Sequence, residues 1–457
     1  MTAGVTAVVL AAGQGKRMRS NYPKVIHNVG GGPMLSRVLE SAGQAGVDEQ
    51  VVVVGYGREK IYEVMGDLNY VVQEKQLGTG HAVNQARDVL GGECRDVLVL
   101  CGDTPLIRGD TLKALLGQHR EREAAATILT AEIADPRGYG RIIRNESGSV
   151  TEIVEDADAS PRELEIKEVN SGTYIFNRTE LFLALENIKP DNVQGEYYLT
   201  DVVKDFFDRG KRVEAFRLED SEEILGINDR VQLAHAEGIL RKRKNEELML
   251  AGVTIVDPDT TRIGPHVTAG RDTIIHPFTI IEGHTNIGAE CEIGPSAVIQ
   301  ESFIGDRVLF HNSMIVESRL GNNCNVGPFS YIRPGTHVGD NVRIGDFVEI
   351  KKSNIGHGSK IPHHSYVGDA SIGDNVNIGA GTIFCNYDGA NKWQTTVEEG
   401  AFIGSNSNLV APLQIGRGAY IAAGSTITKD VPGGALGVAR GRQTNIDNWV
   451  NKKMKDT

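Results

Sequence analysis

The stretch from residue 281 to residue 299, IEGHTNIGAECEIGPSAVI, places an isoleucine at every sixth position: Ile281, Ile287, Ile293 and Ile299. A period of six fits neither an α-helix, which repeats about every 3.6 residues, nor a simple strand, which repeats about every two. It is the period of hexapeptide repeats, whose inward aliphatic side chains stack on their equivalents in the next coil. The stretch therefore predicts a parallel β-helix.

The six-residue period extends from residue 263 to residue 427, with slips of register between blocks. Chance does not sustain such a register, so we expect residues 252–457 to form one β-helix domain. The block from Phe384 to Gly400 interrupts the period and is expected to be a loop on one face of the coil. The further aliphatic positions are Leu320, Val326, Ile332, Val338, Ile344, Ile350, Ile361, Val367, Ile372, Ile378, Ile403, Leu409, Ile415, Ile421 and Ile427.

Residues 1–229 follow a different pattern, in which short apolar segments alternate with segments of helical spacing. This pattern predicts an α/β domain with a Rossmann-like, mostly parallel sheet that binds ligands beyond the carboxyl ends of its strands. Residues 230–251 are predicted to form a linker helix, whose basic run fits a solvated helix end better than a nucleic-acid patch. The expected strands are 5–10, 51–54 and 96–100, and the expected helices are 34–45, 81–90 and 111–119.

Composition narrows the class of protein. The 457 residues carry a formal net charge of −12, which gives no global electrostatic footprint for nucleic acid. Five scattered cysteines argue against a disulfide framework and a zinc site. The chain has no run of 18 apolar residues, and no basic segment precedes the apolar stretch near its N-terminus. We therefore expect a soluble, cytoplasmic protein without membrane or nucleic-acid partners.

Two features after the predicted strands suggest phosphate chemistry. The first is the loop Gly13-Gln14-Gly15-Lys16-Arg17, where glycines admit phosphate oxygens to the backbone and cations balance their charge. A plain strand-to-helix turn explains this loop equally well. The second is Asp103, where a carboxylate suits the hard-oxygen preference of Mg²⁺. A helix cap or turn aspartate is the alternative for that position.

Several short motifs occur together and in order along the N-terminal half. With the hexapeptide half, they resemble the bacterial bifunctional N-acetylglucosamine-1-phosphate uridyltransferases and glucosamine-1-phosphate acetyltransferases over nearly the whole chain. The motifs are Leu10-Ala11-Ala12-Gly13-x-Gly15-x-Arg17-Met18, Pro23-Lys24, Gln76-Leu77-Gly78-Thr79-Gly80-His81-Ala82, Gly102-Asp103-x-Pro105-Leu106, Gly138-Tyr139-Gly140-Arg141, Asn170-Ser171-Gly172, Gln194-Gly195-Glu196-Tyr197-Tyr198-Leu199-Thr200-Asp201 and Gly226-Ile227-Asn228-Asp229-Arg230.

The resemblance implies roles for residues of the N-terminal half. Asp103 and Asn228 would ligate Mg²⁺, and Arg17 and Lys24 would hold the triphosphate of UTP. The sugar phosphate would attack the α-phosphorus in line, without a covalent intermediate. The nucleotide and UDP-sugar contacts would come from Leu10, Ala11, Ala12, Gly13, Gln73, Gly78, Thr79, Cys101 and Gly102, and the sugar contacts from Gly140, Glu155 and Asn170. Lys16 and Gly32 depart from the family pattern, which has threonine and lysine there.

For the C-terminal half, the resemblance implies an acetyltransferase whose general base is His363. A histidine on a coil is otherwise more often structural, and the adjacent His364 is interpreted as a bystander. The family has a left-handed β-helix and forms homotrimers. The sugar phosphate would contact Arg333, Lys351, Tyr366 and Asn377, and acetyl-CoA would contact Ala380, Asn386, Tyr387, Ser405, Ala423 and Arg440.

Three functions stay open at this point. The first is the bifunctional enzyme, which makes N-acetylglucosamine-1-phosphate and then UDP-N-acetylglucosamine for cell-envelope polymers. The second is a nucleotidylyltransferase whose β-helix only oligomerises or regulates, against which the intact His363, Tyr366 and Asn386-Tyr387 count. The third is a non-enzymatic binding module, against which Lys24, Asp103 and Asn228 count.

Overall fold

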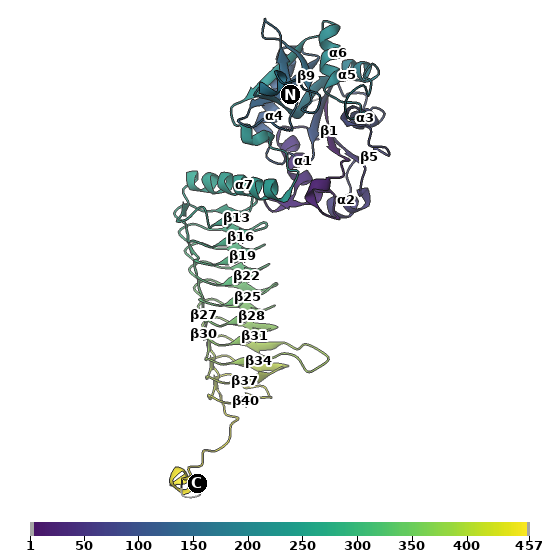
Figure 1. The fold of residues 1–457 in the computed structure, drawn as a ribbon. Helices are drawn as coiled ribbons and strands as arrows, with labels where there is room; N and C mark the ends of the chain where they lie inside the picture. Colours follow the sequence, from purple (N-terminus) through teal and green to yellow (C-terminus); the bar gives the residue numbers. More distant parts are fainter. Residues whose placement is uncertain (1–3, 455–457) are drawn as a thin grey trace. The chain divides into compact units, whose positions relative to one another are not determined.

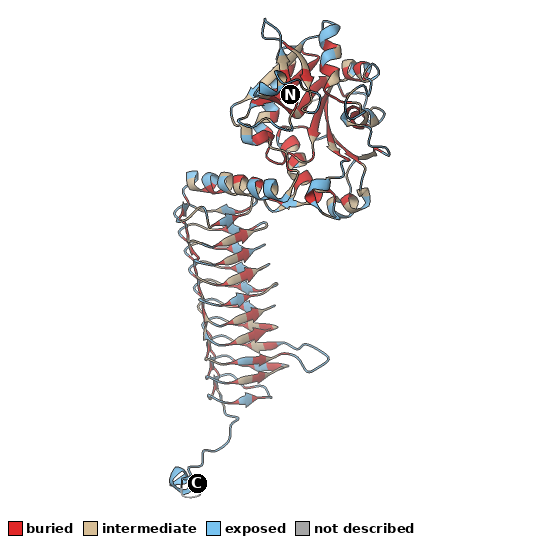
Figure 2. Cartoon of the chain, viewed as in Figure 1, coloured by how far each residue is buried: buried red, intermediate tan, exposed pale blue. Residues whose placement is uncertain are grey.

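The computed structural model describes residues 4–454 and divides into two compact units at residues 240 and 241. The predicted domain limits, 1–229 and 252–457, include residues 1–3 and 455–457, which lie outside the described residues. Each unit has its own hydrophobic core, and Figure 2 shows buried residues gathered inside each of them.

The first unit is built on a mixed sheet with the strand order β11-β7-β10-β6-β1-β4-β5. Every neighbouring pair in this order is parallel except the two that involve β10, which is antiparallel to β6 and β7. The short strands β8 and β9 extend the sheet beside β10. The strands are β1 (Val5–Ala11), β4 (Gln50–Val54), β5 (Tyr70–Val72), β6 (Asp96–Cys101), β7 (Ala126–Glu132), β8 (Arg141–Arg144), β9 (Val150–Val154), β10 (Glu168–Asn177) and β11 (Val213–Leu218).

Helices pack on this sheet, and two separate apolar clusters line its two faces. Strand β1 shows why: Val8 belongs to one cluster and its neighbours Ala7 and Val9 to the other, so β1 is buried on both sides. A two-stranded hairpin, β2 (Asn28–Val29) with β3 (Gly32–Pro33), precedes the first helix. The helices are α1 (Met34–Gln44), α2 (Arg58–Met65), α3 (Thr79–Gln85), α4 (Gly109–Glu121), α5 (Arg178–Leu185) and α6 (Asp201–Asp208).

The predicted elements of this half are all present, with small differences at their ends. The helix expected at 81–90 begins earlier, at Thr79, and ends at Gln85. The helix expected at 230–251 is α7 (Arg230–Leu250). Its early residues Ala236 and Ile239 pack against Met18 and Met34, whereas Leu248 belongs to the core of the second unit.

The second unit is the predicted β-helix. Its strands are stacked one above another in Figure 1 and form three all-parallel sheets. Together the two units confirm the predicted fold class, an α/β nucleotidyltransferase domain followed by a left-handed parallel β-helix of hexapeptide repeats. The three sheets run from β12 (Thr254–Ile255) to β41 (Leu436–Gly437), from β13 (Arg262–Ile263) to β40 (Thr426–Ile427), and from β14 (Thr268–Ala269) to β38 (Leu413–Ile415).

The stacked aliphatic columns are the physical basis of this unit. Ile263, Ile281 and Ile299 lie in register on successive coils of one sheet, and all three are buried. Each coil needs about 18 residues to pass three such columns, which is three hexapeptides. In Figure 2 the strands accordingly carry buried residues beside exposed ones.

The interruption predicted from Phe384 to Gly400 is shorter than the sequence suggests. Phe384 lies in β34 (Ile383–Cys385), is fully buried and pairs with Leu409, so it belongs to a core column. Val397 in β35 (Thr395–Val397) likewise pairs with Ile415. The inserted loop is therefore 386–394, which leaves the stack after β34 in Figure 1. The six-residue period was counted on aliphatic residues, so the phenylalanine at position 384 concealed that the period continues there.

The described residues end in a short helix, α8 (Trp449–Lys453). Among residues 4–454, no helix is both long enough and apolar enough to cross a membrane.

Candidate functional site

A cavity of about 710 Å³ opens in the first unit, beyond the carboxyl ends of β1 and β4. This is the predicted position for a ligand in a parallel sheet. Residues from six separate segments contribute to it: 10–17, 24, 56, 73–82, 196 and 228. The lining residues are Leu10, Ala12, Gly13, Gln14, Gly15, Lys16, Arg17, Lys24, Tyr56, Gln73, Gln76, Gly78, Thr79, Ala82, Glu196 and Asn228.

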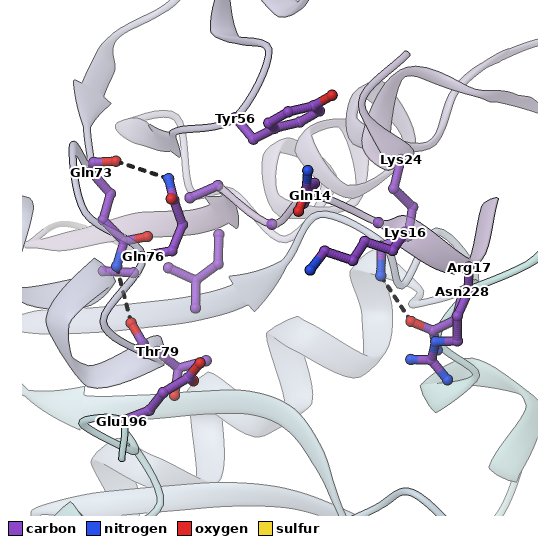
Figure 3. Close-up of a pocket in the computed structure, with 16 residues that line it drawn as sticks. Gln14, Lys16, Arg17, Lys24, Tyr56, Gln73, Gln76, Thr79, Glu196 and Asn228 are labelled. Atoms are coloured by element: carbon purple, nitrogen blue, oxygen red, sulfur yellow. Dashed lines mark hydrogen bonds between the residues drawn. The ribbon is translucent and has the colours of Figure 1, made fainter. Parts of the chain in front are cut away.

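Positive charge gathers at one end of this cavity. In Figure 3, Lys16, Arg17 and Lys24 lie at the end where Asn228 also lies. The loop can take this path because Gly15 has a φ of 61° and lacks a side chain. A Cβ at Gly15 would stand 2.6 Å from the Cβ of Lys24, so this glycine lets the loop pack directly on the lysine stem.

Lys24 joins the two residues that the resemblance assigns to Mg²⁺. Its Nζ forms a hydrogen-bonded ion pair with Asp103 Oδ2 and donates to Asn228 Oδ1 at 2.9 Å. The side chains of Lys24 and Asp103 are 14% and 22% exposed, so both are largely withdrawn from solvent. Two oxygens from distant parts of the chain thus converge on one cation.

Hydrogen bonds to the backbone anchor the two residues that carry these oxygens. Asp103 follows strand β6, and the carbonyl of Asp103 accepts a hydrogen bond of 2.9 Å from the amide of Ile227. The backbone amide of Asn228 donates to Gln232 Oε1 at 2.7 Å. A carboxylate and an amide oxygen at a common point are the hard donors that Mg²⁺ prefers, with phosphates and water supplying the rest. The residues present therefore fit this ion.

The other end of the cavity carries amide and backbone groups and one carboxylate, that of Glu196, which lies beside Thr79 in Figure 3. Gln73 is buried and donates through Nε2 to the carbonyl of Gly78 at 3.1 Å. Gly78 has a φ of 109°, and a Cβ there would lie 2.5 Å from the carbonyl oxygen of Tyr197. Thr79 begins helix α3, and its hydroxyl accepts a hydrogen bond of 3.0 Å from the backbone amide of Leu199. Backbone groups and amide side chains of this kind suit the hydrogen-bonding edge of a base.

The three residues predicted to hold the sugar form a second group, outside the lining of this cavity. A Cβ on Gly140 would lie 3.6 Å from both the Cβ of Asn170 and Oε2 of Glu155. Glu155 accepts a hydrogen bond of 3.0 Å from the Thr200 hydroxyl. Burial is the main cause that raises the pKa of Glu155. A buried carboxyl beside an amide can bind the hydroxyl groups of a sugar.

Cys101 lies between these two groups of residues. It ends strand β6, beside Leu10 of β1. Burial, with the Asp103 carboxylate as the next cause, raises the pKa of the Cys101 thiol to about 12, and Lys24 and Glu155 also act on it. The thiol therefore stays protonated and is not a nucleophile.

Not every residue predicted for the nucleotide lines the cavity. Ala11 and Gly102 are buried outside the lining. Asp103 does not line the cavity either, but it bonds to Lys24, which lines it together with Asn228. Lys16 lines it, but Gly32 does not and belongs to the β2–β3 hairpin. Gly15 had been expected to admit phosphate as part of the glycine loop, and the lining residues without a predicted role of their own are Gln14, Tyr56, Gln76, Ala82 and Glu196. Tyr56 had a signal in the sequence, since it follows the strand at 51–54.

In the second unit, residues predicted for acetyl transfer lie along one corner of the coil. Strand β27 (Arg343–Asp346) pairs with β30 (Lys360–His363) so that Asp346 lies opposite His363. On the following coils, Ala380, Ser405 and Ala423 occupy the equivalent corner positions. Corner amides link these coils: Gly381 to the carbonyl of His363, Asn406 to that of Ala380 and Gly424 to that of Ser405. Arg440 Nη1 reaches the carbonyl of Ala423 at 2.8 Å.

Among the described residues, His363 has a hydrogen-bond partner at only one of its two ring nitrogens. Its Nδ1 lies 2.6 Å from Asp346 Oδ1, and this contact lowers the pKa of the Asp346 carboxyl. In the described part of the chain, Nε2 of His363 has no hydrogen-bond partner, and half of the side chain is exposed. A carboxylate on Nδ1 leaves Nε2 as the proton-accepting nitrogen.

The face that follows this corner carries cations. Lys351 ends strand β28 (Glu349–Lys351) of the β13–β40 sheet, and Arg333 directly follows the neighbouring strand β25 (Tyr331–Ile332) and pairs through Nη1 with Glu349 at 2.7 Å. Lys351 Nζ lies 3.9 Å from Asp369 Oδ2. Contact with the Lys351 ammonium lowers the pKa of Lys392, a residue of the inserted loop. Two ammonium groups that share one nearby carboxylate, that of Asp369, carry a net positive charge that can bind an anion.

The loop is anchored beside these lysines. Asn386 donates through Nδ2 to Asp369 and lies 3.5 Å from the Tyr366 hydroxyl. Gly368 leaves room for both, since a Cβ there would lie 2.4 Å from that hydroxyl. Tyr387 is exposed on the same loop and pairs with Lys392 across a β-bridge.

Asn377 does not join the other predicted phosphate contacts. It belongs to β33 (Asn377–Ile378) of the β12–β41 sheet, whereas Tyr366 belongs to β31 (Tyr366–Gly368) of the β13–β40 sheet. The corner with His363 separates these two faces. His364 stacks on Phe347 with ring centres 4.9 Å apart, which agrees with its interpretation as a bystander.

Three residues near this second site escaped sequence reasoning: Asp346, Asp369 and Lys392. Asp369 lies in the Tyr366-Val367-Gly368-Asp369-Ala370 segment, and Lys392 lies in the interrupting block. Both residues therefore lie in segments that the sequence had already marked as candidates for the site. Asp346 had none, because only the strand register brings it to His363.

Comparisons with known proteins cover both units. A nucleotidyl transferase family model matches residues 6–226, and a bacterial transferase hexapeptide model of six repeats matches residues 317–352 and 394–429. The chain is 54% identical over 451 residues to the "Bifunctional protein GlmU" of Heliobacterium modesticaldum, with 98% of each chain covered. The proteins of the same name from Halalkalibacterium halodurans and Carboxydothermus hydrogenoformans are 50% and 51% identical, and the alignments cover 97–99% of each chain.

Proposed function

The chain belongs to the family of bifunctional GlmU proteins, and from this premise we propose that its two units catalyse successive steps toward one nucleotide sugar. The second unit acetylates glucosamine-1-phosphate with acetyl-CoA. The first unit then transfers UMP from UTP to the resulting N-acetylglucosamine-1-phosphate, which gives UDP-N-acetylglucosamine and pyrophosphate.

In the uridylyl transfer, the chain acts by positioning and by charge. Gln73, Gly78 and Thr79 bind the base, and Arg17 and Lys24 bind the triphosphate at the cationic end of the cavity. Gly140, Glu155 and Asn170 orient the sugar. The sugar phosphate oxygen bonds to the α-phosphorus as the bond to the β-phosphate oxygen breaks.

Magnesium is the metal we propose for this unit, and Asp103 and Asn228 are the residues that hold it. When bound, the ion neutralises charge on the phosphates. The oxygens of these two residues already converge on a single point, now occupied by the Lys24 ammonium.

In the acetyl transfer, the amine of the sugar attacks the thioester carbonyl. Nε2 of His363 takes the proton that the amine loses, and the sulfur of coenzyme A leaves with the electron pair of the broken C–S bond. Asp346 keeps the ring oriented through Nδ1. Arg333, Lys351, Tyr366 and Asn377 bind the phosphate, and Lys392 joins them. Acetyl-CoA lies along the corner formed by Ala380, Ser405 and Ala423, with Asn386, Tyr387 and Arg440 beside it.

A homotrimer in the cytoplasm is the proposed state of the enzyme. Support comes from the division of the predicted contacts, since Asn377 and Tyr366 lie on different faces of one chain. A face of a second copy can complete the site. Light scattering on the purified chain gives the oligomeric mass, and a monomer with full acetyl transfer would contradict this arrangement.

The observation that carries the acetyl half is the 2.6 Å contact between His363 and Asp346, at the head of the corner formed by Ala380, Ser405 and Ala423. The test is thiol release from acetyl-CoA on addition of glucosamine-1-phosphate without UTP, with the background from protein thiols subtracted. We expect release that His363→Ala abolishes and the neighbouring His364→Ala retains. Pyrophosphate release from UTP should persist in both variants.

No thiol release from a folded, UTP-binding chain would leave a nucleotidylyltransferase with a structural β-helix. The nucleotide half has its own test. UTP with magnesium should raise the melting temperature of the wild type, because a ligand of the folded state stabilises it. Asp103→Ala should lose that rise and keep acetyl transfer. A wild type without any rise would instead indicate a binding module of another kind.

A further inference from the structure

Lys24 occupies the point between Asp103 and Asn228 that a metal ion would take. Its ammonium bonds to the carboxylate of Asp103 and to the amide oxygen of Asn228, at 2.9 Å for the latter. Of the described residues, these two are the only hydrogen-bond partners of Nζ. The ammonium therefore uses the same oxygens that we assign to Mg²⁺.

Hydrogen bonds to the backbone anchor the two residues whose oxygens hold this ammonium. The backbone amide of Ile227 donates to the backbone carbonyl of Asp103, and the backbone amide of Asn228 donates to the side chain of Gln232. Gly15 packs on the Lys24 stem, with no room for a Cβ between them. The lysine thus bonds to two oxygens of anchored residues in a largely buried setting.

We propose that Lys24 is an internal counter-cation that closes the metal position until a nucleotide arrives. A divalent ion and an ammonium cannot share these two oxygens, because their positive charges repel strongly where water is largely excluded. The triphosphate of an incoming nucleotide offers the ammonium other oxygens. Lys24 then moves to the phosphates, and the metal takes the two vacated oxygens.

This exchange predicts that metal and nucleotide binding are coupled. The metal alone binds weakly because it must displace Lys24, and nucleotide binding removes that cost. By reciprocity, the metal strengthens nucleotide binding by the same factor. The role is additional to the proposed contact of Lys24 with the triphosphate, and it rests on the proposed metal pair.

The matched variants are Lys24→Met and Lys16→Met in the full-length chain. Both remove one positive charge from the lining of the same cavity, but in the described structure only Lys24 bonds to Asp103 and Asn228. Mn²⁺ is the probe, because the electron paramagnetic resonance signal of free Mn²⁺ reports its binding directly. Each chain is titrated with Mn²⁺ without nucleotide and again with UTP, and a titration of UTP without protein is subtracted because UTP itself binds Mn²⁺.

We expect Lys24→Met to bind Mn²⁺ without nucleotide about tenfold more tightly than the wild type. The same variant should bind UTP more weakly, so its two affinities change in opposite directions. Lys16→Met should change the affinity for Mn²⁺ alone by no more than about twofold, the size of a screened charge effect. Adding Asp103→Asn to Lys24→Met should abolish the gain, which places the ion at this pair.

Two results would overturn the proposal: no gain in Lys24→Met, or an equal gain in Lys16→Met, which would mean a general charge effect. A thermal unfolding transition of the first unit like that of the wild type shows that this unit is folded in each variant. A wild type that binds no additional Mn²⁺ when UTP is present would contradict the proposed metal site itself. A wild type that takes up Mn²⁺ with UTP, beside a Lys24→Met chain without the gain, would refute the exchange alone.

Discussion

Replacing Gly345 with alanine tests how closely the stacking of the coils controls the acetyl-transfer site. Gly345 precedes Asp346 in strand β27, and its backbone faces Pro362 on the next coil. An added Cβ would lie 1.8 Å from the carbonyl oxygen of Pro362. A carbon and a carbonyl oxygen normally stay about 3.3 Å apart, so the two coils must separate here by about 1.5 Å.

That separation has a calculable effect on stability. Two hydrogen bonds flank the position, from the amide of Arg343 to Ser359 and from the amide of His364 to Asp346, each 3.0 Å long. An extra 1.5 Å breaks both, at about 1 kcal/mol each. Overpacking adds about 1–3 kcal/mol. We expect the free energy of unfolding of the second unit to fall by about 3–5 kcal/mol.

The effect on catalysis should be larger than the effect on stability suggests. The contact of 2.6 Å between His363 and Asp346 spans the same two coils, so it lengthens with their separation. A misplacement of about 1 Å can cost about a hundredfold in rate. We therefore expect thiol release to fall at least about a hundredfold, with pyrophosphate release from UTP unchanged.

The control is Gly264→Ala in the first coils of the same unit, where the nearest atom would lie 3.4 Å from the new Cβ. Urea unfolding and the two product assays measure all three chains. A Gly345→Ala chain with wild-type unfolding and wild-type thiol release would refute the argument, because the coils would then have absorbed the methyl without moving the site.

Three further predictions concern other parts of the molecule. Lys392→Met should raise the KM for glucosamine-1-phosphate about tenfold through loss of a charged phosphate contact, and a KM within about twofold of wild type in steady-state assays would contradict this. Phe384→Ala should lower the free energy of unfolding of the β-helix by about 3–5 kcal/mol and Phe384→Leu by less than about 1.5 kcal/mol, whereas equal urea midpoints would place Phe384 outside the core column. Burial, then the Asp158 carboxylate, raises the pKa of Asp201 to about 6. The folded state therefore holds a proton that the unfolded state has lost between about pH 4 and pH 6, so stability falls as pH rises through that range. Asp201→Asn should raise the urea midpoint at about pH 7, with a gain that shrinks toward about pH 4, and a gain independent of pH would be inconsistent with this titration.

The architecture of both units could be predicted from local patterns. The six-residue period of isoleucine and valine has one packing solution, a stack of coils, because each inward side chain must meet an equivalent one above and below. The apolar segments at 5–10 and 51–54 likewise had to be strands buried on both faces. The direction of each strand could not be predicted in the same way, because apolar patterning does not encode direction. Strand β10 is antiparallel to its neighbours β6 and β7.

Site residues divide in the same way. Asp103 and the glycine loop could be predicted because each follows a strand, where parallel sheets bind ligands. Gly140, Glu155 and Asn170 rested on resemblance alone. A register shift in β10 between Asn170 and Tyr174 accompanies the approach of Asn170 to Gly140, and no local pattern marks that shift.

By itself, the sequence determined the two folds, the segments that carry the chemistry and the place where the β-helix is interrupted. These features depend on neighbours along the chain and on periods that a reader can count. Only the tertiary structure decided that Lys24 bonds to Asp103 and Asn228, that Asp346 orients His363, and that Lys392 meets Lys351. Each of these pairings joins residues of different strands or loops. Their contact energy depends on strand register and loop closure, which packing of the whole unit sets.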